Sequence, residues 1–126
     1  MAKNILMVED SATIRHLQCF VLKAQGFEVE TAENGVEALE KLFANPDKFA
    51  LLVADINMPK MDGLTLIRKL REQEAFINFP VIIVSSEQEE EDRKAGLLAG
   101  ANMYMIKPIK PEVLAANVKM LLGEVK

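Results

Sequence analysis

The chain has 126 residues, of which 50% are hydrophobic and 27% are charged, and we expect a single globular domain over residues 1–126. Its formal net charge of −4 argues against non-specific nucleic-acid binding, which depends on a basic surface. The single cysteine, Cys19, and an N-terminal apolar run too short for a signal peptide or a membrane span indicate a soluble cytoplasmic chain without membrane contact.

Four short apolar runs are bounded by polar or turn residues and are predicted to be strands buried on both faces, which is typical of a parallel sheet. They cover residues 5–8, 51–54, 81–84 and 103–106. A fifth strand is predicted from Phe27 to Thr31. Because Val29 alternates with two glutamates there, we expect this strand to lie half exposed at an edge of the sheet.

Segments of helical period separate the runs. Ser11 is placed to cap the first helix and Gly26 to end it. The predicted apolar stripes are Ile14, Leu17, Val21 and Leu22; Val36, Leu39 and Phe43; Leu66, Ile67 and Leu70; and Leu114, Val118 and Leu121. Arg68, Lys69 and Arg71 are interpreted as the exposed face of the third helix.

The fourth helix is predicted to be the weakest. It begins with the acidic run from Glu87 to Asp92, and Gly96 interrupts its pattern. Its apolar face would come only from Ala95, Leu97, Leu98 and Ala99. The order β-α, repeated five times, predicts an α/β fold in which helices cover both faces of a parallel sheet.

Each of the four apolar runs leads into polar residues, namely Glu9-Asp10, Asp55, Ser85-Ser86 and Lys107. In a parallel sheet these ends share one rim, where open α/β sheets bind their ligands. Taken alone, Asp10 could equally cap a helix, Ser85 is more often a capping hydroxyl, and Lys107 is more often a surface lysine. Their corresponding positions in successive βα units favour a common site. The lone His16 is interpreted as a surface residue.

The chemistry that suits this set is phosphoryl transfer to a carboxylate. Three neighbouring carboxylates require a cation, and oxygen ligands without a partnering Cys or His favour Mg²⁺. Asp55 would be the nucleophile and would form an acyl phosphate. The Ser85 hydroxyl and the Lys107 ammonium could bind the remaining phosphoryl oxygens.

The chain resembles the receiver domains of two-component response regulators, in particular the single-domain CheY-like type. The resemblance rests on Glu9-Asp10-Ser11, on Asp55 followed by Met58-Pro59-Lys60-Met61-Asp62-Gly63, on Ser85-Ser86 and on Lys107-Pro108. It covers essentially the whole chain. It implies a flavodoxin-like (CheY-like) (βα)5 fold with strand order 2-1-3-4-5, an order taken from that family.

The resemblance also implies roles for individual residues. Asp55 would accept a phosphoryl group from a histidine kinase. Asp10, Asp55 and the backbone carbonyl of Asn57 would bind Mg²⁺ directly, and Glu9, which replaces the commoner aspartate, would act through water. Lys107 would contact the phosphoryl group after a cis Lys107–Pro108 bond. Ser85, where threonine is frequent, would form the conformational switch together with Tyr104.

The expected function is a phosphorylation-activated switch that is monomeric and is not an enzyme beyond phosphorylating and dephosphorylating itself. We expect that no output domain follows the last helix and that the signal passes to a downstream protein, which would bind the fourth helix, fifth strand and fifth helix. A phosphorelay intermediate remains an alternative, as does a pseudo-receiver, against which the intact acidic set argues. Asn57 disfavours an aspartyl-phosphate hydrolase, because such enzymes carry a second acidic residue there. Glu9-Asp10 disfavours a flavodoxin-like electron carrier, because it would repel a flavin phosphate.

Overall fold

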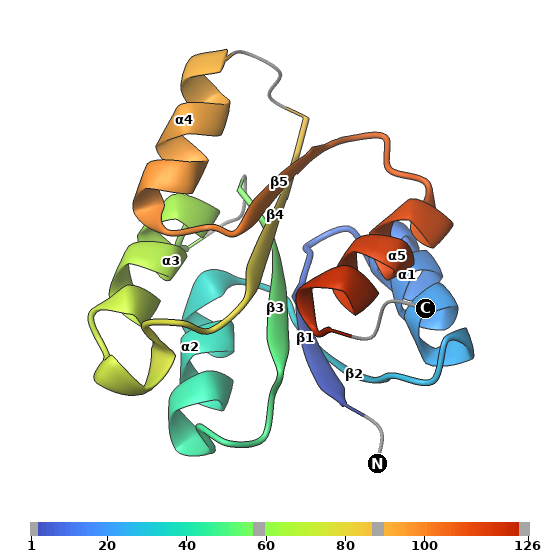
Figure 1. Cartoon of the computed structure of the whole chain (residues 1–126), viewed down its shortest axis with the longest axis horizontal. Helices are drawn as coiled ribbons and strands as arrows, with labels where there is room; N and C mark the ends of the chain where they lie inside the picture. The colour runs from blue at the N-terminus through green and yellow to red at the C-terminus, as the bar shows by residue number, and fades with distance from the viewer. Residues whose placement is uncertain (1–2, 57–59, 87–89, 124–126) are drawn as a thin grey trace.

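The computed structural model describes residues 3–56, 60–86 and 90–123 (Figure 1). Strands and helices alternate five times, as predicted. In chain order they are β1 (Asn4–Val8), α1 (Ala12–Ala24), β2 (Glu28–Ala32), α2 (Gly35–Ala44), β3 (Leu51–Asp55), α3 (Gly63–Arg71), β4 (Val81–Ser85), α4 (Glu90–Ala99), β5 (Met103–Ile106) and α5 (Pro111–Leu121). A short 3₁₀ helix, η1 (Glu74–Phe76), lies between α3 and β4 and was not predicted.

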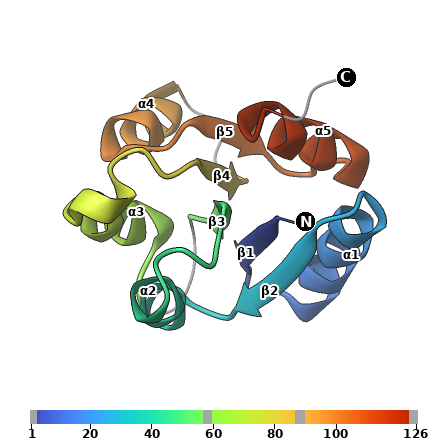
Figure 2. The same ribbon diagram turned by 60° about the horizontal axis from the view of Figure 1, so that its bottom comes forward.

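The five strands form one parallel sheet in the order β2-β1-β3-β4-β5, which confirms the expected topology. The strand β2 lies at an edge and is only partly buried, as its alternating sequence predicted. Helices α1 and α5 cover one face of the sheet, and α2, α3 and α4 cover the other (Figures 1 and 2). The sheet is therefore the middle of three layers.

Alternate residues of the central strands supply two separate cores, because successive side chains of a strand point to opposite faces. Leu6, Leu52 and Ile83 belong to the core under α2, α3 and α4. Ile5 and Val53 belong to the core under α1 and α5. Burial on both faces explains why these strands are apolar throughout rather than alternating.

The helix ends follow local sequence signals. The Ser11 hydroxyl accepts a hydrogen bond from the backbone N–H of Ile14 at 3.5 Å, and the Asp62 carboxylate accepts one from Thr65 at 2.8 Å. Gly26, just beyond α1, has a φ of 96°, a conformation that favours glycine. The caps and stops predicted for α1 are therefore present.

Two apolar stripes were assigned to the wrong helix faces. In α1, Leu17 is 53% exposed, while Gln18 and Cys19 are buried beside Leu22. In α2, Val36 and Phe43 are each 40% exposed, and the buried residues are Gly35, Ala38, Leu39 and Leu42. A sequence stripe fixes the buried face only to within a residue or two, because packing against the sheet and the neighbouring helix sets the rotation of a helix. The stripe of α3 and most of that of α5 are buried as predicted.

The buried face of α4 also differs from the prediction. Leu98 is 87% exposed, and the buried residues are Gly96 and Ala99. Gly96 therefore does not interrupt the apolar face of α4 but forms part of it. Its small size lets the helix approach the sheet closely.

Candidate functional site

The polar residues singled out in the sequence meet at one rim of the sheet. Asp55 is the last residue of β3, and Ser85 is the last residue of β4. Glu9 and Asp10 directly follow β1, and Lys107 directly follows β5. Because all the strands are parallel and β3 pairs with both β1 and β4, these ends lie together.

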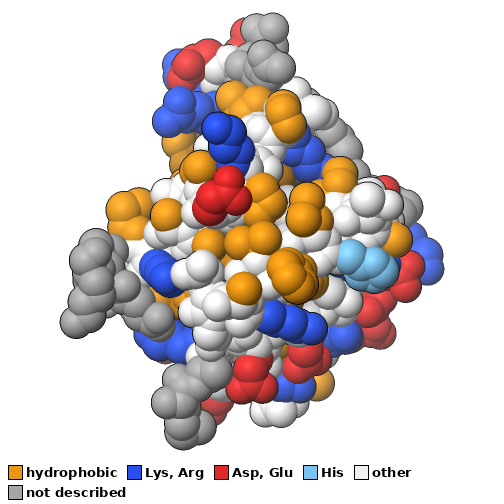
Figure 3. Space-filling model, turned by 90° about the vertical axis from the view of Figure 1, so that its right-hand side faces the viewer, with side chains coloured by type: hydrophobic (Ala, Val, Ile, Leu, Met, Phe, Trp, Pro, Cys, Tyr) orange, Lys and Arg blue, Asp and Glu red, His pale blue; other side chains and the backbone are white. Residues whose placement is uncertain are grey.

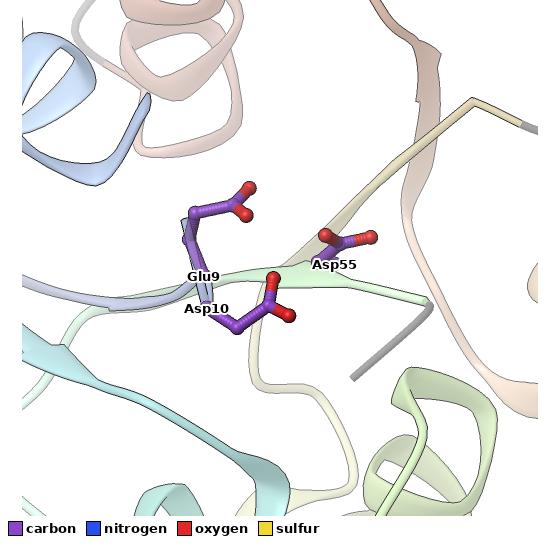
Figure 4. Close-up of side chains that lie close together, drawn as sticks. All are labelled: Glu9, Asp10 and Asp55. Carbon is purple, nitrogen blue, oxygen red and sulfur yellow. The ribbon is translucent and has the colours of Figure 1, made fainter. Parts of the chain in front are cut away.

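Three carboxylates form a compact acidic cluster at this rim. Glu9, Asp10 and Asp55 each place one carboxylate oxygen within 4.8 Å of the others (Figure 4). Glu9 and Asp55 are 3% and 5% exposed, whereas Asp10 is exposed. Two buried carboxylates and one exposed carboxylate so close together repel one another strongly, and a cation would relieve that repulsion.

Lys107 supplies part of the compensating positive charge. Its Nζ atom donates to Oδ2 of Asp55 at 2.9 Å and to Oε1 of Glu9 at 3.1 Å. The Lys107–Pro108 peptide bond is cis, as predicted. With one ammonium against three carboxylates, the cluster keeps an excess of negative charge.

Glu9 and Lys107 influence each other's pKa values. Burial raises the pKa of Glu9, although a hydrogen bond from the Ser11 N–H and the contact with Lys107 act in the opposite direction. Burial by itself lowers the pKa of Lys107, but hydrogen bonds and Coulomb attraction to Asp55 and Glu9 outweigh it, so the pKa of Lys107 is raised. The lysine therefore stays protonated beside the acidic cluster.

Two residues that were assigned no role of their own from the sequence help to fix this geometry. Arg15 donates from Nη1 to the backbone carbonyl of Glu9 at 2.8 Å, and so holds the end of β1 from the first turn of α1. Gly63, the first residue of α3, packs directly on the strand end: a Cβ there would lie 2.6 Å from the Asp55 carbonyl oxygen. The turn residues Asp62-Gly63 were the available sequence signal for this contact.

Ser85 and Tyr104 lie on the face of the sheet that α2, α3 and α4 cover. Ser85 is completely buried, and it follows Ile83 by two residues, so strand alternation puts both on the side covered by α4. Tyr104 pairs in register with Ile83 and packs, partly buried, against the same core. Asn57, the remaining expected metal ligand, lies outside the described residues.

An apolar hollow of about 440 Å³ adjoins the site on the side of α1 and α5. Lys107 and Ser86 line its polar part, and Ile14, Leu17 and Pro108 contribute to its apolar part. Figure 3, which faces α1 and α5, shows hydrophobic side chains gathered in the middle of this face of the molecule. Leu17, which is exposed on α1, belongs to this surface.

A protein-family model described as the response regulator receiver domain matches residues 5–119. The chain is 41% identical to the chemotaxis protein CheY1 of Helicobacter pylori over 121 residues, covering 95% of this chain and 97% of that protein. It is 36% identical to the phosphate regulon transcriptional regulatory protein PhoB of Escherichia coli, covering 99% of this chain and 54% of that protein. The chain thus spans about half the length of PhoB.

Solved structures agree with these sequence matches. The chemotaxis protein CheY4 of Vibrio cholerae superposes with a TM-score of 0.88 at 31% identity, covering 96% of this chain and 99% of that chain. The receiver domain of a signal transduction histidine kinase from Syntrophus aciditrophicus gives a TM-score of 0.87 at 37% identity, covering 99% of this chain and 93% of that one.

Among the described residues, no helix is both long and apolar enough to cross a membrane.

Proposed function

Since this chain belongs to the response regulator receiver domain family, we propose that it is a phosphorylation-activated switch in which Asp55 accepts a phosphoryl group from a histidine kinase. The observation that carries the proposal is the placement of Asp55. It is a buried carboxylate at the end of the central strand, paired with the Lys107 ammonium in a salt bridge and flanked by Glu9 and Asp10.

The proposed transfer is a direct displacement. A carboxylate oxygen of Asp55 attacks the phosphorus of a phosphohistidine, a P–O bond forms, and the P–N bond breaks so that imidazole leaves. Lys107 holds one side of the Asp55 carboxylate and can bind a phosphoryl oxygen after transfer. Ser85, at the end of the neighbouring strand, is the second proposed donor to that group.

The acidic cluster fits a divalent cation, and we propose Mg²⁺ because all three side chains offer hard oxygen ligands. Asp10 and Asp55 would bind the ion directly, together with the carbonyl of Asn57, and Glu9 would act through water. When bound, the ion would neutralise negative charge on the transferred phosphoryl group.

We propose that the output passes to a partner protein through α4, β5 and α5, with Ser85 and Tyr104 as the switch. The whole chain, residues 1–126, would then act as one receiver domain, as a monomer in the cytoplasm. A role as a phosphorelay intermediate is the second candidate, favoured by the match to a receiver domain taken from a histidine kinase. That match shows a similar domain within another signalling protein.

The direct test is mass spectrometry after incubation with acetyl phosphate and Mg²⁺. The wild-type protein should gain one phosphoryl group, and Asp55→Asn should gain none, because an amide cannot form the acyl phosphate. Asp47→Asn, an exposed aspartate in the loop before β3, is the matched control and should label fully. Full labelling of Asp55→Asn would place the phosphoacceptor elsewhere.

A further inference from the structure

The face of α4 that packs on the sheet carries a glycine at a point where a side chain would fit only if its neighbours shifted. A Cβ atom on Gly96 would lie 2.9 Å from Cδ1 of Ile83 and 2.9 Å from Cδ2 of Tyr104. It would also lie 3.3 Å from Cε2 of Tyr104. The Tyr104 ring and the end of the Ile83 side chain would therefore have to shift to admit a side chain at Gly96.

The Tyr104 ring, which belongs to β5, packs between β4 and α4. Ile83 and Tyr104 are partners in the β4–β5 register, and both pack in the core beneath α4. Gly96 approaches the same ring from the helix. Ser85 shares this face of the sheet two residues beyond Ile83. The position of α4 and the position of the ring are therefore mutually dependent.

The C-terminal end of α4 is tied down by α3. The Arg71 guanidinium donates to the carbonyl oxygen of Gly100 from Nη2 at 2.7 Å and from Nε at 3.2 Å. It also donates to the carbonyl oxygen of Phe76 at 2.6 Å. Gly96 lies about one helical turn before this tie. A displacement of α4 would therefore pivot near Gly100 and change the space above Gly96.

We propose that Gly96 is a positioning residue for Tyr104: its missing side chain creates the slot in which the ring packs against α4, and so couples the ring to the helix. The placement of the ring stands on the contacts above, whereas its consequence for signalling rests on the proposed function. A methyl group at position 96 should either push the ring toward solvent or push α4 away from the sheet. Either displacement would bias the switch against the state with the ring packed inward.

Tyrosine fluorescence can test the slot directly, because Tyr104 is the only tyrosine in the chain and there is no tryptophan. Gly96→Ala should raise the acrylamide quenching constant of the unphosphorylated protein about twofold, since a partly buried ring becomes more exposed. Leu98→Ala changes the exposed face of the same helix and should leave quenching unchanged. An unchanged quenching constant in Gly96→Ala would overturn the proposal.

Thermal unfolding supplies an independent test, because the effect of Gly96→Ala on the Tm should have opposite signs in two backgrounds. Gly96→Ala should lower the Tm of the otherwise wild-type protein because of the clash. In a Tyr104→Ala/Ile83→Val background, which removes the clashing atoms, the same substitution should raise the Tm, because alanine favours helix over glycine. If the clash prevents folding of the single variant, the triple variant should still fold. A lowered Tm in both backgrounds would contradict the slot.

The signalling consequence is tested with acetyl phosphate and Mg²⁺. Gly96→Ala should gain the phosphoryl group as the wild-type protein does, yet lose most of the phosphorylation-dependent change in Tyr104 quenching. A full change in the variant would overturn the coupling. If the wild-type protein gains no phosphoryl group, the proposed function fails, while the quenching of the unphosphorylated variants still decides the position of the ring.

Discussion

At the scale of single residues, the two members of the acidic pair have different surroundings. The Glu9 carboxylate is buried and is engaged by the Ser11 N–H at 3.1 Å and by Lys107. Asp10 is exposed, and its carboxylate belongs to the same cluster. Glu9 is thus held by the protein, and Asp10 is the member that solvent and ions reach most easily.

This difference predicts unequal effects on Mg²⁺ binding. Asp10→Ala removes the proposed direct ligand and should weaken Mg²⁺ affinity roughly tenfold or more. Glu9→Gln keeps the length and polarity of the side chain, so it should weaken affinity less. Calorimetric titration of both variants with Mg²⁺ provides the measurement. Equal affinities would contradict the assignment of Asp10 as the direct ligand and Glu9 as the water-mediated one.

At the scale of secondary-structure elements, Arg71 corrects the interpretation of α3 as a helix with a wholly solvated basic face. Arg68 and Lys69 are exposed, but Arg71 is half-buried, and burial lowers its pKa. Its guanidinium joins α3 to the loop after α4 through Gly100 and to η1 through Phe76. The fork of donors in arginine suits such divergent carbonyl acceptors.

Arg71→Ala should therefore lower the free energy of unfolding by about 2–3 kcal/mol, because two partly buried carbonyl groups lose charged donors. Arg71→Lys should restore only part of this, since a single ammonium cannot reproduce the fork. Arg68→Ala, on the exposed side of the same helix, should change the stability by less than about 0.5 kcal/mol. Urea unfolding of the three variants measures these changes in the free energy of unfolding. Equal losses for Arg68 and Arg71 would show that the bridge contributes little.

At the scale of the whole molecule, the proposed phosphoacceptor and the proposed switch residue Tyr104 lie at different places on the sheet. Asp55 and Lys107 meet at the rim, while Tyr104 packs beneath α4. Ser85 is placed to join them, because it ends the strand next to β3 and shares a face with Tyr104. A buried hydroxyl that moves toward the phosphoryl group would leave space on the α4 side.

We therefore expect Ser85→Ala to accept the phosphoryl group but to lose most of the phosphorylation-dependent shifts of α4 amide resonances. The two conformations need differ by only about a few kcal/mol for phosphorylation to exchange their populations. Heteronuclear NMR of wild-type and variant proteins, with and without acetyl phosphate, measures this. Undiminished shifts in α4 would mean that the coupling follows another route.

The sequence alone determined the alternation of strands and helices around a parallel sheet and the composition of the rim. Continuous apolar runs, such as residues 51–54, can be satisfied only by strands buried on both faces, and their spacing requires intervening helices. Since each run leads into a polar residue, the parallel sheet brings Glu9, Asp10, Asp55 and Lys107 together. The strand order itself came from the resemblance to a family and not from periodicity.

Only the tertiary structure decided which way the helices turn and which long-range contacts form. The rotation of α1, which buries Gln18 and exposes Leu17, depends on packing against α5 and the sheet. The Arg71 bridge and the slot at Gly96 join residues that are distant in sequence. A local pattern indicates the period of a helix but not what packs against it. Gly96 therefore interrupts the apolar pattern of the sequence, although in the fold it is the point of α4 against which the Tyr104 ring packs.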